Sequence, residues 1–100
     1  MAGIPRIVAV DDTDQIGRIL RGAMSLMDRR FIMVEVPNAQ IALDELRTSD
    51  ISLLVTAYNL PDLSGLELAN RAIRERAGTP VIVLATAQDE IEVEEDKLAT

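Results

Sequence analysis

The chain has 100 residues, so we expect one domain spanning residues 1–100 around a single core rather than a multidomain enzyme. Hydrophobic residues make up 48% and charged residues 27%, and only Phe31 and Tyr58 are aromatic, so the core must be aliphatic. The absence of Cys and His excludes disulfides, cysteine nucleophiles and thiolate or imidazole metal sites, which leaves oxygen as the expected metal ligand.

The net charge of −7 is unevenly distributed along the chain. Residues 88–97 hold six acids against one lysine, so we expect an acidic tail over about 88–100 behind a nearly balanced body. A negative surface argues against binding to nucleic acid or to an anionic membrane. No apolar run approaches the roughly 20 residues that cross a bilayer, and residues 1–6 do not resemble a secretory signal, which predicts a cytoplasmic protein.

Short apolar runs alternate with longer segments of helical period along the chain. The runs cover residues 7–10, 31–36, 51–55 and 81–85 and predict four buried strands. Thr13 or Asp14 is the expected N-cap of the first helix, and Ser64 opens the third. The apolar positions expected to face inward are Ile16, Ile19, Leu20, Ala23 and Met27 in the first helix, Ala39, Ala42, Leu43 and Leu46 in the second, and Leu66, Ala69, Ala72 and Ile73 in the third.

This order of elements predicts an α/β fold with an open, doubly wound parallel sheet, because crossover connections between parallel strands are right-handed. In such sheets, binding sites form in the loops that leave the carboxyl ends of the strands. The first strand ends at Asp11 and Asp12, the third runs into the loop 56–65, and the fourth ends at Thr86 and Ala87. Two adjacent carboxylates favour a hard divalent cation, although acids also simply begin a helix at its positive end.

Taken together, these three segments resemble the receiver domain of two-component response regulators over residues 7–87. The resemblance implies a flavodoxin-like sheet with strand order 2-1-3-4, truncated here to about four strands. It also implies a signalling domain rather than an enzyme, with a histidine kinase or phosphotransfer protein as partner. In that family, an aspartate at the end of the third strand attacks the phosphorus of a phosphohistidine, and Mg²⁺ neutralises the charge.

The resemblance assigns a role to each matching residue. Asp11 and Asp12 would hold Mg²⁺ directly or through water, and Asn59 would contribute its backbone carbonyl. Thr86 would turn its hydroxyl toward the phosphoryl group, and the amide of Ala87 would bond one of its oxygens.

Two features depart from the family pattern. The phosphoacceptor should lie four residues before Pro61, where Ala57 stands, and a methyl group can neither attack phosphorus nor coordinate a metal. An engineered substitution and a natural pseudo-receiver both explain Ala57, and either leaves Mg²⁺ binding weak or absent. The only lysine, Lys97, belongs to the acidic tail and does not match the family's phosphate-binding lysine, and no fifth strand or helix has a counterpart.

The sequence therefore predicts a phosphorelay receiver domain that cannot be phosphorylated as written. The alternative is a phosphorylation-independent pseudo-receiver that acts as an interaction or dimerisation module. In either case the fourth strand becomes a sheet edge, which we expect to be covered by a second copy of the chain, giving a homodimer, or by the tail.

Overall fold

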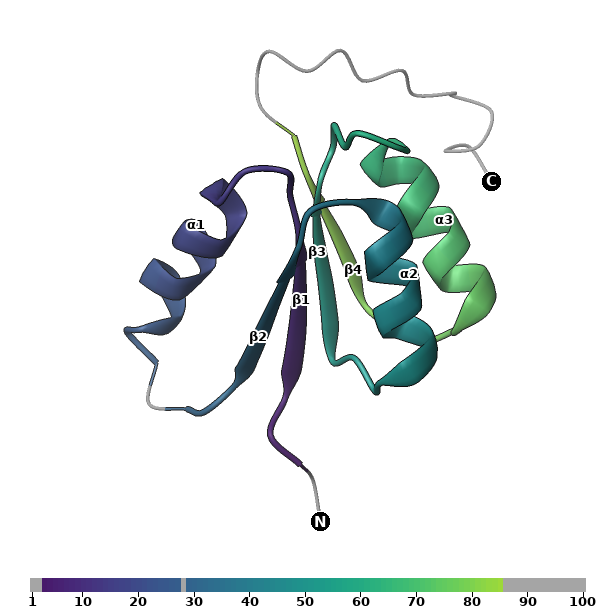
Figure 1. The fold of residues 1–100 in the computed structure, drawn as a ribbon. Coiled ribbons are helices and arrows are strands. Elements are labelled where there is room, and N and C mark those ends of the chain that lie inside the picture. The colour runs from purple at the N-terminus through teal and green to yellow at the C-terminus, as the bar shows by residue number, and fades with distance from the viewer. Residues whose placement is uncertain (1–2, 28, 86–100) are drawn as a thin grey trace, which may run out of the picture.

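The computed structural model describes residues 3–27 and 29–85 (Figure 1). The elements follow the expected alternation of strands and helices. They are β1 (Arg6–Val10), α1 (Gln15–Met24), β2 (Ile32–Val36), α2 (Ala39–Thr48), β3 (Leu53–Ala57), α3 (Gly65–Glu75) and β4 (Val81–Leu84). None of these helices is long and apolar enough to cross a membrane. The expected acidic tail lies outside the described residues.

The four strands form one parallel sheet in the order β2-β1-β3-β4, which confirms the predicted fold class and strand order. Val8 lies opposite Val34 on one side and Leu54 on the other, so β1 and β3 form the centre of the sheet. The third strand lies two residues later than predicted, because it runs from Leu53 to Ala57. Ala57 is therefore the last residue of a central strand.

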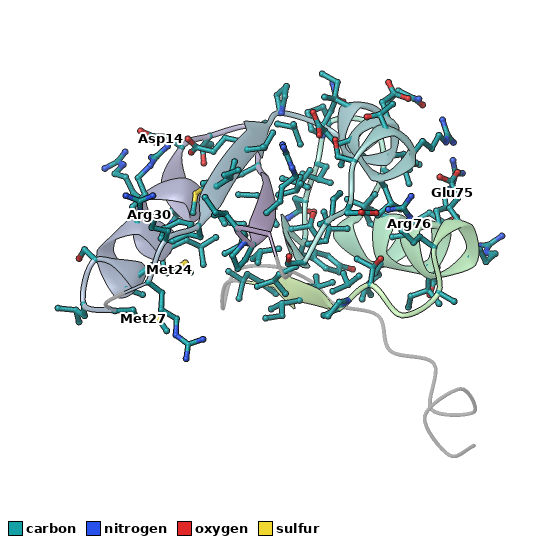
Figure 2. The ribbon with its side chains drawn as sticks, turned by 90° about the horizontal axis from the view of Figure 1, so that it is seen from below. Asp14, Met24, Met27, Arg30, Glu75 and Arg76 are labelled. Atoms are coloured by element: carbon teal, nitrogen blue, oxygen red, sulfur yellow. The ribbon has the colours of Figure 1, made fainter. Side chains whose placement is uncertain are left out.

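Helices cover the two faces of the sheet unequally. Helices α2 and α3 lie side by side on one face, and α1 stands alone on the other, as both views show (Figures 1 and 2). The side chains of each strand alternate between the two faces and form two separate apolar clusters. The larger one, under α2 and α3, includes Val8, Val10, Leu46, Leu54 and Leu68. The smaller one, under α1, consists of Ile7, Ala9, Ile16 and Val55 with partly buried neighbours.

Several side chains expected to face inward are exposed instead, because a single helix covers only part of the α1 face. Ile19 is 55% exposed, and Met27 lies beyond the end of α1 and is 53% exposed. Leu20 and Met24 pack against the small cluster in their place, and Figure 2 shows Met24 and Met27 at the free end of α1. On α3, Gly65, Leu68 and Ala72 are buried, whereas the predicted inward residues Leu66 and Ile73 are exposed.

Candidate functional site

A cavity of about 420 Å³ opens at the carboxyl rim of the sheet, between the start of α1 and the ends of β3 and β4. Asp11 and Asp12 bring carboxylates to this cavity, Ala57 brings a methyl group, and Ile16, Ile19 and Leu84 bring larger apolar side chains. The lining residues are Asp11, Asp12, Thr13, Gln15, Ile16, Ile19, Ala57, Tyr58, Asn59, Leu84 and Ala85.

Asp11 has a structural role at this rim in addition to facing the cavity. Its backbone N–H donates to the carbonyl of Val36 at 3.0 Å, which extends the β1–β2 ladder by one residue. Its two carboxylate oxygens accept from the N–H groups of Thr13 at 3.1 Å and Ile16 at 3.0 Å. Asp11 thus caps α1, as the helix-start interpretation expects, while the remaining lone pairs of its carboxylate stay available to a cation.

The first turn of α1 is capped from outside the helix. Asp14 is the N-cap residue by position, yet its side chain makes no capping bond and pairs with Arg18 one turn later. The hydroxyl of Thr13 accepts from the N–H of Gln15 at 3.2 Å instead. Asp12, between these capping groups, is exposed at the cavity mouth.

The end of β3 is held by close backbone contacts. The N–H of Gly65 donates to the carbonyl of Tyr58 at 2.6 Å, and Asn59 forms a β-bridge with Ser64, so the loop folds back on itself. The buried hydroxyl of Thr56 donates to the carbonyl of Ala57 at 2.9 Å. These bonds hold the backbone on both sides of Ala57 next to the cavity.

Asp62 connects this loop to the start of α2. Its carboxylate accepts from the N–H groups of Ala39, Gln40 and Leu63, each at 3.0 Å. Partial desolvation by itself raises the pKa of this carboxyl, but the bonds from backbone N–H groups together outweigh that effect and hold the pKa below the usual 3.8. With Asn38, which accepts from Ile41 at 2.9 Å, Asp62 satisfies three N–H groups in the first turn of α2.

We expect Asp62→Asn to lower the free energy of unfolding by about 1 kcal/mol at neutral pH, since a neutral amide replaces the charged cap. Because the folded pKa lies below the unfolded one, this stabilisation is complete above pH 4 or so and is lost as the pH falls through the folded value. Urea unfolding of both proteins at a series of pH values measures it. Asp44→Asn neutralises an exposed carboxylate that pairs with Arg47 and accepts from the Gln40 side chain, and it should change stability by less than about 0.5 kcal/mol. Equal losses for the two variants at every pH would contradict the capping role.

The structure brings together the predicted residues Asp11, Asp12, Ala57 and Asn59 around one cavity. Thr86 and Ala87 lie outside the described residues, although Leu84 and Ala85, which immediately precede them, line the same cavity. The sequence did not indicate the contribution of Ile19, because its helical spacing predicted a core position.

The cavity is lined by oxygen donors of the kind that Mg²⁺ prefers. Asp11, Asp12 and the carbonyl group of Asn59 are all oxygen donors, and Mg²⁺ is commonly bound through one or two carboxylates while it keeps several waters. However, the described part of the chain holds no group of three or more Asp or Glu side chains placed to share a metal ion. Ala57 also lines the cavity, and its methyl group supplies no donor.

Comparisons with known proteins agree with this architecture. The response regulator receiver domain family matches residues 7–99. A chemotaxis protein CheY homolog from Campylobacter jejuni is 28% identical over 91 residues, which cover 88% of this chain and 69% of that protein. The signal receiver domain of an HD domain-containing protein from Pseudomonas fluorescens superimposes with a TM-score of 0.77 at 25% identity, over 89% of this chain and 64% of the other. The response regulator TrrA of Thermotoga maritima, solved in complex with Mg²⁺ and BeF, gives a TM-score of 0.72 at 22% identity, over 85% and 72% of the two chains.

The four-stranded parallel sheet in the order 2-1-3-4, with helices on both faces, matches the flavodoxin-like fold of receiver domains. Within that class, the chain belongs to the response regulator receiver domain family. It is thus a receiver domain of two-component signalling, a family of signalling domains rather than of conventional enzymes. The chain spans less than two thirds of the Pseudomonas chain it matches.

Proposed function

We propose that this receiver domain engages a histidine kinase or phosphotransfer protein in the cytoplasm without accepting a phosphoryl group. The observation that carries the proposal is the position of Ala57. Ala57 is the last residue of β3 and lines the cavity together with the acid pair Asp11 and Asp12 and with Asn59. At this point the family's reaction requires a nucleophilic carboxylate, and a methyl group has no lone pair.

Mg²⁺ is the cofactor that fits this site, held by Asp11 and Asp12 directly or through water, with the carbonyl of Asn59. The TrrA structure contains Mg²⁺ with BeF, and the matching acids of this chain support the same type of site. We expect binding to be weak, because Ala57 contributes no third carboxylate. Mg²⁺ supplies charge neutralisation for phosphoryl transfer. Because Ala57 is no acceptor, no phosphoryl group becomes covalently attached here even when Mg²⁺ is bound. Thr86 and Ala87 would contact a phosphoryl group, as the family resemblance implies.

The test is to incubate the chain with Mg²⁺ and a small phosphodonor such as acetyl phosphate, and to measure the intact mass. We expect no phosphoryl group on the chain over several hours, because neither Asp11 nor Asp12 is placed to act as the acceptor. The carboxylate of Asp11 is engaged by two backbone N–H groups, and Asp12 is exposed in the loop between β1 and α1, not at the end of β3. An acid-labile phosphoryl group on either aspartate would overturn the proposal.

A second candidate is a pseudo-receiver that acts as an interaction or dimerisation module independently of phosphorylation. It is favoured by the same methyl group and by the exposed apolar side chains of β4, of which Ile82 is 46% and Leu84 39% exposed. Mixing with a phosphotransfer domain separates the two candidates. The receiver function requires the phosphotransfer domain to bind at the carboxyl rim of the sheet, so Asp12→Arg should abolish that binding. The interaction module does not require binding at this rim.

A further inference from the structure

The loop between β3 and α3 carries Asn59, whose backbone carbonyl group is the third oxygen donor of the Mg²⁺ site proposed above. The N–H of Gly65 donates to the carbonyl of Tyr58 at 2.6 Å, and Asn59 and Ser64 form an antiparallel β-bridge one step inside that bond. This is the non-hydrogen-bonded position of an antiparallel pair, in which the N–H and C=O groups of each residue point away from its partner. The carbonyl group of Asn59 is therefore directed away from Ser64.

The direction of this carbonyl group depends on the residues that follow it. The carbonyl belongs to the peptide that joins Asn59 to Leu60, and Leu60 precedes Pro61. Proline fixes its own φ angle and restricts the residue before it to extended conformations, so Leu60 and Pro61 form a stiff segment. The orientation of the Asn59–Leu60 peptide is consequently coupled to the position of Asp62 at the far end of this segment.

Asp62 anchors the loop to a different part of the fold. Helix α2 begins at the same end of the sheet at which this loop leaves β3 (Figure 1). One carboxylate oxygen of Asp62, Oδ1, accepts from the N–H groups of Ala39 and Leu63, and the other, Oδ2, accepts from that of Gln40, each at 3.0 Å. Two of these three bonds cross from the loop to the first turn of α2, so they fix the loop relative to a helix that packs on the sheet.

We propose that Asp62 is a positioning residue for Mg²⁺ binding, because its bonds to α2 hold the peptide group of Asn59 in one orientation beside the cavity. This role rests on the Mg²⁺ site proposed above and extends it to a residue that does not itself line the cavity. Without the anchor, Leu60 and Leu63 would hold the loop only by packing against the larger apolar cluster, and such packing is not directional. Mg²⁺ would then have to order the loop as it binds, which lowers its affinity.

Residual dipolar couplings of the full chain in a dilute aligned medium test the orientation without Mg²⁺. The N–H of Leu60 lies in the same peptide plane as the carbonyl of Asn59, and motion averages its coupling toward zero. The coupling should fall by about half or more in Asp62→Ala. The matched control is Asn38→Ala, which removes another capping acceptor of α2, bonded to Ile41 at 2.9 Å, and leaves the three bonds of Asp62 in place. The Leu60 coupling should be unchanged in this control.

Titration of the same proteins with Mg²⁺, followed through the amide signals of Asp11 and Asp12, measures the effect on binding. The Kd should rise about fivefold or more in Asp62→Ala and stay within about twofold in Asn38→Ala, with circular dichroism showing that both variants are folded. Asp62→Asn separates positioning from charge, since it is neutral but retains an oxygen that can accept from Ala39 and Leu63. Its Kd should be less than about half that of Asp62→Ala.

Each contrary result has a distinct meaning. No response of Asp11 and Asp12 to Mg²⁺ in the unchanged chain would reject the proposed Mg²⁺ site and the role of Asp62 with it. A response that Asp62→Ala leaves intact, or a Leu60 coupling that it does not alter, would reject the role of Asp62 alone. Equal losses in Asp62→Ala and Asn38→Ala would trace the effect to a weakened α2, and equal Kd values for Asp62→Ala and Asp62→Asn would trace it to the lost charge. Either result would also overturn the positioning role.

Discussion

Replacing Gly65 with alanine should destabilise the protein by about 3 kcal/mol, at the upper end of the usual cost of overpacking. A Cβ atom at this position would lie 2.2 Å from the carbonyl oxygen of Ala57 and 3.1 Å from the Cα of Tyr58. Both neighbours are backbone atoms, one in Ala57 at the end of β3 and one in Tyr58 directly after it, so no side-chain rotation can relieve the clash. The loop must move away from β3, which breaks the bond from Gly65 to Tyr58.

Gly22→Ala is the matched control for this substitution. Gly22 lies in the interior of α1, and an added Cβ would meet nothing within 4 Å. Alanine there should stabilise the protein by roughly 0.5–1 kcal/mol, because it lowers the entropy of the unfolded chain and favours the helix. Urea unfolding of both variants measures the difference. If Gly65→Ala unfolds at the same urea concentration as the unchanged chain, the close approach of α3 to β3 is wrong.

The sheet could be predicted from the sequence because its signal is repetitive. Four apolar runs separated by three helical segments specify parallel strands, and the right-handed crossover rule excludes most other connections. The gathering of Asp11, Ala57 and Asn59 at one rim follows from that topology, since the carboxyl ends of parallel strands share one edge. The roles of these residues in binding Mg²⁺ or phosphate stay predictions.

Features that depend on how the helices sit could not be predicted. Apolar spacing alone placed Ile19 and Ile73 in the core, yet both are more than half exposed, and the residues that each helix buries are Ile16 and Gly17 in α1 and Gly65, Leu68 and Ala72 in α3. The capping of α2 by Asp62 joins residues 22 and 23 positions apart in sequence, so no local pattern reveals it. The contact of Gly65 with Ala57 is likewise a matter of tertiary distance, although the sequence marked the loop that contains it.

Ala57→Asp should allow the site to accept a single phosphoryl group from a phosphodonor, with which the unchanged chain does not react. The new carboxylate would join Asp11 and Asp12 among the residues that line the cavity. A third negative charge in a partly enclosed site should tighten Mg²⁺ binding at least tenfold, which corresponds to about 1.4 kcal/mol. Titration with Mg²⁺, followed through the amide signals of Asp11, Asp12 and Asn59, measures this gain against the unchanged chain.

Covalent labelling should follow from the same substitution. With acetyl phosphate, a carboxylate oxygen of residue 57 would attack phosphorus as acetate leaves with its electron pair, and the resulting acyl phosphate is acid-labile. We expect labelling to be slow, because the only lysine of the sequence, Lys97, lies among acids in the tail. Ala57→Asn is the control, since it matches aspartate in size but offers no nucleophile, and it should neither be labelled nor bind Mg²⁺ more tightly. If Ala57→Asp neither binds Mg²⁺ more tightly nor becomes labelled, restoring the carboxylate does not restore a receiver site in this cavity. The interaction module would then be the better explanation of the chain.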